Sequence, residues 1–321
     1  MIAIMDKRKL DINKIDQKLH DDYRSNRYLE YLPEKDLQDR ANDILVNLTA
    51  ITPNGKISLA CKEDNGGYWY SRFNHIIEEF RLRYGPYPVG FTKGFIKNAA
   101  IPSLSSPLVN KSCSLVEKLG TDQDRSFFRV GEYKYLKDLI AYGDLRISPA
   151  SSYNDPSLNA AIQDDELNLT IRPYRKPFPI YQYDPPVSPI PGYIVNEIKS
   201  VSDTNYYVMC MSYKYRPRLP IDFKADSVLQ ISDVIGFSKR IKESVKNELP
   251  DWEMGVAMVE YIDPILPMNT RPETLTCKHF KYAYQSEIRF IWRPPEPVAV
   301  LDHIHVNLGD VNSFCQLYDL R

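Results

Sequence analysis

Between Tyr284 and Phe290 the chain alternates apolar and polar residues, which is the pattern of a β-strand with one buried face. Because side chains of a strand point to opposite faces in turn, Gln285, Glu287 and Arg289 are expected to share one face. Burying an amide, a carboxylate and a guanidinium is costly unless these groups interact with one another. An ordinary solvated sheet face explains the same alternation, so the rest of the chain has to decide between the two interpretations.

The second half of the chain is rich in predicted strands. Short runs of β-branched and aromatic residues recur there, bounded by Gly, Pro, Asn and Asp. Two predicted helices interrupt these strands, and Gly143 follows the first helix as a C-cap. The expected class is therefore a compact, strand-rich α+β fold. The predicted strands are 126–130, 145–148, 206–213, 227–231, 256–261, 283–292 and 298–306, and the helices are 133–142 and 237–248.

The first part of the chain is expected to be mostly helical. Residues 6–50 carry an apolar stripe at helical spacing, and Pro33 suits the first position of a helix. A short strand at 57–61 and a helix through 75–83 follow. The segment 100–125 is rich in Ser and Pro and then charged, which is typical of a connection between two units.

Two domains are therefore expected: a helical unit for recognition or regulation at 1–125, and the strand-rich unit at 126–321. The motif G-F-T-K at 90–93 returns as G-F-S-K at 236–239, which suggests that the first unit is a degenerate repeat of the fold of the second unit. Residues 173–191 hold seven prolines, which excludes regular structure and predicts a long loop such as a lid.

Composition narrows the classes of function. Lys and Arg number 41 against 42 Asp and Glu, and this net charge of −1 argues against bulk electrostatic binding to nucleic acid or to a membrane. No segment approaches the ~20 apolar residues of a membrane span, and the apolar N-terminus is too short for a signal peptide. The five cysteines include no C-x-x-C pair and the histidines no H-x-x-x-H pair. We therefore expect free thiols, a cytoplasmic protein and no metal site.

Three predicted strands each offer one polar residue among apolar neighbours, namely Arg129, Ser212 and Glu287. A lone Arg on such a strand is commonly a salt-bridge partner at a sheet edge, and a lone Ser is commonly a tolerated core hydroxyl. Their order along the chain is less easily explained by packing. Arg, Ser and then Gln-x-Glu, formed by Gln285 and Glu287, resemble the Arg-Ser-Glu class of ADP-ribosyltransferases, the fold of several bacterial toxins.

Two further resemblances point in the same direction. The turn Y-N-D-P at 153–156, the C-x-S strand at 210–212 and the late Q-S-E-I-R-F motif resemble an uncharacterised bacterial family that bears an N-D-P motif. Residues 84–93 are similar to abortive-infection proteins of the AbiG type, which are associated with phage defence. The resemblance thus implies a toxin or phage-defence protein with an ADP-ribosyltransferase-like domain over 126–321 that uses NAD as a substrate.

The resemblance also implies a role for each motif residue. In such enzymes the bond between nicotinamide and ribose breaks early, and a carboxylate stabilises the oxocarbenium-like sugar. Glu287 would take this role, and Gln285 would orient the acceptor. Arg129 would bind the phosphates of NAD through its bidentate fork, which needs no glycine-rich loop. Ser212 would steady the neighbouring strand or the nicotinamide ribose.

Four more residues are assigned to the cofactor. An aromatic ring, that of Tyr153 or Tyr213, would stack on the nicotinamide. Asn154 and Asp155 would belong to the cleft, although a type I turn or a helix cap explains the pair without any function. The chain departs from the class at Cys210-Met211-Ser212, where the usual motif is Ser-Thr-Ser, and this departure concerns Ser212 directly.

Several functions remain open. Transfer of ADP-ribose to a macromolecular acceptor, protein or nucleic acid, is favoured by Gln285, because hydrolysis of NAD by water needs no acceptor-orienting amide. A non-catalytic module, such as an antitoxin or a phage-sensing partner, is favoured by the 23 tyrosines, a residue type enriched at interfaces. The alternating basic and aromatic residues of 213–218 suit a nucleic-acid binder. Lys278 and Lys281 could contact phosphate, but they are expected to be solvated.

Overall fold

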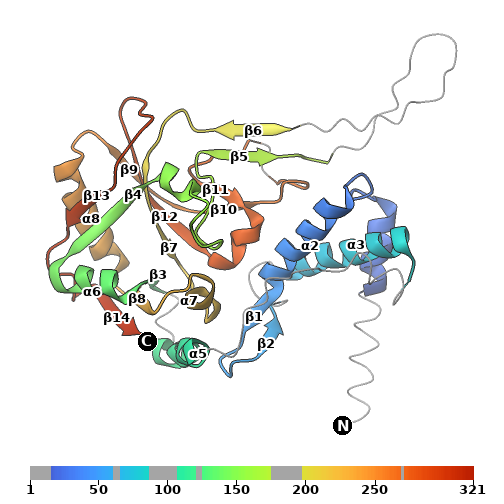
Figure 1. Ribbon diagram of the computed structural model, residues 1–321, viewed down its shortest axis with the longest axis horizontal. Helices are drawn as coiled ribbons and strands as arrows, with labels where there is room; N and C mark the ends of the chain where they lie inside the picture. The colour runs from blue at the N-terminus through green and yellow to red at the C-terminus, as the bar shows by residue number, and fades with distance from the viewer. Residues whose placement is uncertain (1–15, 61–65, 87–106, 121–124, 175–196, 269–270) are drawn as a thin grey trace. The chain divides into compact units, whose positions relative to one another are not determined.

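The computed structural model describes residues 16–60, 66–86, 107–120, 125–174, 197–268 and 271–321 (Figure 1). It confirms a mixed α and β protein. The chain divides into two compact units. Of the described residues, 16–49, 59–60, 66–86 and 173–174 form the first unit, and the others form the second. This division differs from the expected boundary at 125, because the second unit already includes 50–58 and 107–120.

Some predicted features lie outside the described residues. They are residues 6–15 of the predicted helical segment, 87–93 of the segment similar to abortive-infection proteins, the G-F-T-K half of the repeat, and 175–191 of the predicted loop.

The first unit is helical, as predicted. A helix at 16–25 is followed by α2 (Glu34–Leu48), which begins directly after Pro33, and by α3 (Gly66–Tyr84). Two adjacent carboxylates of α3, Glu78 and Glu79, are fully buried, and arginines neutralise both. Glu78 pairs with Arg24 and Arg81, and Glu79 pairs with Arg27 and Arg83. These ion pairs fasten the segment before α2 to α3. A two-stranded sheet, β1 (Thr49–Ile51) and β2 (Ile57–Leu59), follows α2, and its residues 50–58 already belong to the second unit.

The segment 100–125 was predicted to connect two units, but its described part contains the helix α5 (Pro107–Leu119) and belongs to the second unit. Val109, Cys113 and Leu119 are buried along one side of this helix, and proline occupies its first position. The Ser- and Pro-rich composition of the segment masked this helical spacing. The segment is therefore helical because its apolar residues pack against its own unit, which its overall composition does not indicate.

The second unit is built on an eight-stranded antiparallel sheet whose order is β13-β4-β7-β3-β8-β14, with β12 joined to β7 and β9 joined to β12. All pairings in this sheet are antiparallel. Helix α6 (Tyr133–Tyr142), with Gly143 as its left-handed C-cap, matches its prediction. The strands are β3 (Phe127–Gly131), β4 (Asp144–Pro149), β7 (Tyr207–Ser212), β8 (Ser227–Ile231), β9 (Glu253–Met258), β12 (Glu287–Arg293), β13 (Ile304–Asn307) and β14 (Cys315–Asp319).

Smaller elements complete this unit. Strands β5 (Asn168–Ile171) and β6 (Ile198–Val201) form an antiparallel pair, and β10 (Glu260–Ile262) and β11 (Cys277–His279) form a parallel pair. The remaining helices are α7 (Arg218–Asp222), α8 (Val234–Glu248) and two 3-10 segments, η2 (Ala150–Asn154) and η3 (Phe280–Gln285). The main apolar core lies between the sheet and helices α6 and α8, and Phe237, Ile241 and Phe290 are completely buried in it.

The large sheet is forked at β7. One edge of β7 pairs with β12 over the whole strand. The other edge pairs with β4 at Val208 and with β3 at Ser212. Within the described part of the chain, residues 209–211 have no strand partner on this edge. The sheet therefore opens between β3 and β4, beside the middle of β7.

We predict that Gly143→Ala lowers the free energy of unfolding by about 2–4 kcal/mol, the combined cost of a left-handed alanine and an overpacked contact. Gly143 has φ +72°, and a Cβ atom there would lie 2.4 Å from the carbonyl oxygen of Gly309. Urea denaturation measures the effect. Gly255→Ala is the matched control, because a Cβ atom on Gly255 meets nothing within 4 Å. Equal stability of the two variants would contradict this packing argument.

Candidate functional site

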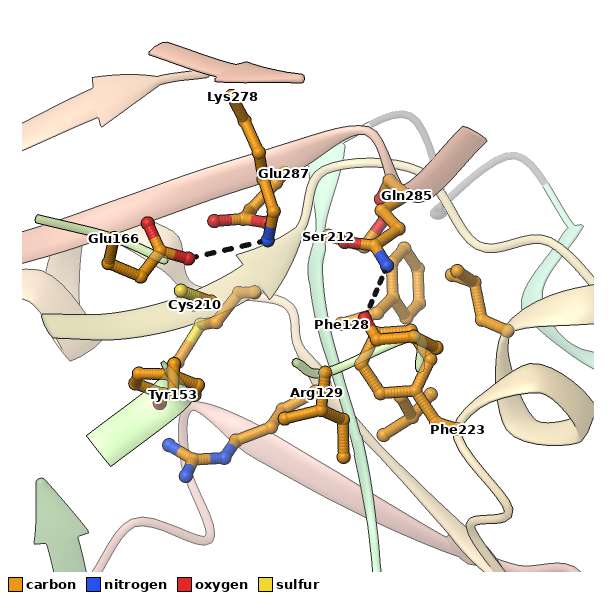
Figure 2. A pocket seen from close by; sticks show the side chains of 15 residues that line it. Phe128, Arg129, Tyr153, Glu166, Cys210, Ser212, Phe223, Lys278, Gln285 and Glu287 are labelled. Carbon is orange, nitrogen blue, oxygen red and sulfur yellow. Dashed lines mark hydrogen bonds and ion pairs between the residues drawn. The ribbon is translucent and has the colours of Figure 1, made fainter. Parts of the chain in front are cut away.

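The three strands that carry the predicted motif are neighbours in the sheet. Phe128 of β3 lies opposite Ser212 of β7, and Ser212 lies opposite Glu287 of β12. Arg129 follows Phe128 on β3. These strands line a cavity of about 190 Å³ at the fork, which we call the inner cavity (Figure 2). Five of the eight predicted site residues line it, namely Arg129, Tyr153, Ser212, Gln285 and Glu287.

The other three predicted residues lie elsewhere. Asn154 and Asp155 line a larger neighbouring space of about 900 Å³, which we call the outer cleft. Arg129 and Tyr153 line both spaces and so mark where they meet. The carboxylate of Asp155 accepts a hydrogen bond from the backbone N–H of Ser157 at 2.8 Å, as in an ordinary turn. Tyr213 lines neither space.

Four buried charged side chains form a closed ring on the wall of the inner cavity, and we call them the charge ring. Arg289 donates from Nε to Glu287 Oε1 at 2.7 Å, and its Nη2 forms an ion pair with Glu166 Oε2 at 2.5 Å. Lys278 Nζ lies 3.1 Å from Glu287 Oε2 and 3.4 Å from Glu166 Oε1. Each carboxylate therefore uses both of its oxygens, and the four charges sum to zero. Figure 2 shows Lys278 between Glu166 and Glu287.

The surroundings of the charge ring satisfy its remaining polar groups. Arg289 is completely buried and also donates to the carbonyl oxygens of Thr274 and Leu275, at 3.2 and 3.0 Å. Asp164 lies 3.7 Å from Lys278 as a third, more exposed carboxylate. Buried charges are tolerated when they are paired and hydrogen-bonded in this way. The polar face predicted for the late strand is thus a buried network and not a solvated sheet face.

Burial and the ring partners shift two carboxyl pKa values in opposite directions. Burial by itself would raise the pKa of Glu287, but the nearby Lys278 and Arg289 outweigh it and hold that pKa at about 2. Burial raises the pKa of Asp164 to about 6, against the opposing effect of Lys278. Glu287 is therefore ionised at neutral pH, whereas the carboxyl group of Asp164 titrates at a pH close to neutral.

The strand predicted at 283–292 begins later than expected. Residues up to Gln285 belong to the 3-10 segment η3, and Ser286 has a left-handed backbone with φ 48°. Strand β12 starts only at Glu287. The prediction that Gln285 shares a strand face with Glu287 was therefore wrong, although both line the inner cavity. A left-handed residue between them breaks the period-two alternation.

The side chains of Gln285 and Ser212 are engaged with backbone groups. Gln285 Nε2 donates to the carbonyl oxygen of Ala161 at 2.7 Å. Ser212 Oγ lies 2.7 Å from the carbonyl oxygen of Gln285 and 2.6 Å from that of Lys214, and its single proton serves one of them at a time. Ser212 thus joins the end of β7 to the residue before the left-handed turn.

Arg129 is differently placed. Its Nη1 atom is buried and has no hydrogen-bond partner among the described residues. Burial lowers the pKa of this guanidinium. Figure 2 shows the side chain extending away from Glu287 and Lys278, on the side of Tyr153. The predicted sheet-edge salt bridge is absent from the described part of the chain, and Arg129 presents an uncompensated positive charge where the two spaces meet.

Sequence reasoning missed Glu166 and misplaced Lys278. Lys278 was expected to be solvated, but it is buried within the charge ring. Glu166 ends an acidic run that resembles a solvated turn. The one local signal for burial of Lys278 is its place in the short strand Cys277–His279, between a cysteine and a histidine, which often occur in protein interiors. Neither spacing nor composition shows that these residues meet Glu287.

Comparisons of this chain with protein-family models, with curated proteins and with solved structures found no match. No helix in the described residues is long and apolar enough to cross a membrane.

We expect Lys278→Met to lower the free energy of unfolding by about 3–5 kcal/mol, because it leaves two buried carboxylates with one cation. Chemical denaturation measures the loss. Lys281→Met is the control, since Lys281 is partly exposed and its ammonium lies over the Tyr282 ring, outside the charge ring. A loss of under ~1 kcal/mol in both variants would show that the ring does not stabilise the fold.

The depressed pKa of Glu287 predicts a loss of stability in acid. Its folded pKa of about 2 lies below the ordinary value of 4.5, so its contribution is complete above pH 4.5 and disappears as the pH falls toward 2. The shift corresponds to about 3 kcal/mol. In Glu287→Gln this part of the pH dependence should vanish in denaturation curves taken from pH 5 to 2.

The raised pKa of Asp164 has the opposite effect on stability. The contribution of Asp164 to the free energy of unfolding is complete below pH 3.8 and is lost as the pH rises through 6.

Proposed function

We propose that this chain is an NAD-dependent ADP-ribosyltransferase that modifies a macromolecular acceptor, in a bacterial toxin or phage-defence setting. One observation carries the proposal: Arg129, Ser212 and Glu287 stand on three neighbouring strands and line a single cavity, with Gln285 beside Glu287. These are the residue types, in the chain order, that the resemblance to the Arg-Ser-Glu class calls for. Unrelated polar residues on separate strands have no reason to converge in this way.

The chemistry of the site supports binding and cleavage of NAD. The nicotinamide would enter the inner cavity, which Phe128, Tyr153 and Phe223 line with aromatic rings. The phosphates would pair with Arg129, whose Nη1 atom has no other partner in the described chain. The ionised carboxylate of Glu287 would stabilise the oxocarbenium-like ribose as the bond to nicotinamide breaks. Ser212 would hold the loop that ends at Gln285.

The fate of the ribose depends on Gln285. For transfer, its amide would have to turn from the Ala161 carbonyl toward an acceptor nucleophile. If the amide stays where it is, water would attack and the protein would be an NAD glycohydrolase. The proposed setting is cytoplasmic, where the free thiols of Cys113, Cys210, Cys277 and Cys315 would remain reduced.

A second candidate is a non-catalytic module with the same cavity, for example an antitoxin or a phage-sensing partner. The observation that favours it is the closed charge ring. Both oxygens of Glu287 are already paired, with Lys278 and Arg289, so the carboxylate has less charge to offer a cationic transition state. In this function the ring would serve stability, and the cavity would bind a ligand without cleaving it.

The decisive experiment follows nicotinamide release from NAD, with and without cell lysate as a source of acceptors. We expect Glu287→Gln to lower the rate at least ~10²-fold, because it removes the charge that faces the ribose. Glu253→Gln, on the exposed edge of β9, is the control and should keep the wild-type rate. Thermal unfolding of each variant confirms that the comparison is made between folded proteins.

The outcomes separate the candidate functions. Label that accumulates on a macromolecule supports transfer, and nicotinamide release without such label supports hydrolysis. Equal release from wild type and a folded Glu287→Gln protein would contradict the catalytic assignment. Binding of NAD by the wild type without any release would favour the non-catalytic module.

A further inference from the structure

A second arginine faces the outer cleft without a counter-ion. Arg146 is an exposed residue of β4, and its backbone pairs with that of His305 on β13. It lines the outer cleft together with Arg129. Its guanidinium forms no hydrogen bond or ion pair with any residue that the structure describes.

Most carboxylates of the outer cleft already have partners. Glu132 pairs with Lys134 at 2.9 Å, and Asp144 Oδ1 lies 3.2 Å from His305 Nδ1. The carboxylate of Asp155 accepts from the backbone of its own turn. Asp138 is exposed on α6. Among the described residues, none of these carboxylates forms an ion pair with Arg129 or Arg146.

The two arginines act on each other electrostatically. After burial, the positive charge of Arg146 is one of the causes that lower the pKa of Arg129. Burial lowers the pKa of His303, which lines the outer cleft too, and the charge of Arg146 lowers it further. Two guanidinium groups in one cleft repel one another when neither forms an ion pair, and an anion bound between them removes that repulsion.

We propose that Arg146 and Arg129 together bind the phosphates of a nucleoside diphosphate in the outer cleft. The guanidinium fork is the side chain best suited to phosphate. A volume of about 900 Å³ accommodates a ligand larger than the inner cavity can hold. Tyr135 lines the outer cleft and is 57% exposed; the Lys134 ammonium lies over one face of its ring, and the other face would be the one for a base to stack on.

Identifying this diphosphate with that of NAD rests on the proposed function, whereas the two-arginine site does not require cleavage. Arg129 would contact the phosphate nearer the inner cavity, and Arg146 the one nearer the base. Arg146 thereby becomes a specificity residue for ligands that carry two phosphates.

Calorimetric titration with ADP, with adenosine and with inorganic pyrophosphate tests the site. We expect Arg146→Gln and Arg129→Gln each to weaken ADP and pyrophosphate binding about 10-fold, the loss of one charge-assisted contact, and to leave adenosine binding unchanged. Arg293→Gln is the control, because this exposed arginine of the same unit pairs with Asp203 outside the cleft. It should bind ADP as the wild type does.

Two results would overturn the inference: equal ADP affinity in wild type and Arg146→Gln, or no binding of ADP and pyrophosphate by the wild type. Since Arg146 is exposed, its variant tests the site even if Arg129→Gln fails to fold. The nicotinamide-release assay separates this inference from the proposed function. Arginine-dependent ADP binding without any nicotinamide release would support the site and refute the catalysis.

Discussion

The candidate site depends on the mutual neutralisation of four buried charges. Glu166, Lys278, Glu287 and Arg289 come from three segments of the chain, and none of them is more than 4% exposed. Each would be very costly to bury by itself, and the closed ring offsets that cost because every charge has two opposite neighbours. The ring fixes the start of β12 against β11 and the segment before β5. It thereby fixes one wall of the inner cavity.

The opposite wall follows from the way the sheet divides. Strand β7 keeps one partner, β12, along its whole length, but on its other edge it passes from β4 to β3. Side chains of β3, β7 and η2 can therefore enter the space beside residues 209–211. A continuous sheet would have closed this space with backbone hydrogen bonds. The cavity is thus a consequence of strand pairing, and the charge ring supplies its polar side.

The electrostatic character of the two spaces differs. In the inner cavity the carboxylates are compensated, and Glu287 is held ionised in a fixed position. Where the cavity meets the outer cleft, Arg129 has a buried Nη1 atom without a hydrogen-bond partner among the described residues, and Arg146 lies farther out on the lining of the cleft. A ligand with a positively charged aromatic head and an anionic tail would complement this arrangement, and NAD has that polarity. The compensation of Glu287 is the feature that a catalytic function has to overcome.

Local sequence patterns were enough to predict several helices and strands and to single out most of the polar residues of the site. Helix α6 with its cap at Gly143, strand β8 and most of β7 follow from periodicities that span only a few residues. The grouping of Arg129, Ser212 and Glu287 was expected from the resemblance to the Arg-Ser-Glu class, because strand patterns do not show which strands are neighbours. The remaining features depend on contacts between distant segments. The ion pairs of Glu166 with Lys278 and Arg289 join segments over 100 residues apart, and the left-handed Ser286 interrupts a pattern that looked continuous. Long-range ion pairs leave no periodicity in a single sequence, since their cost and benefit arise only when burial brings the charges together.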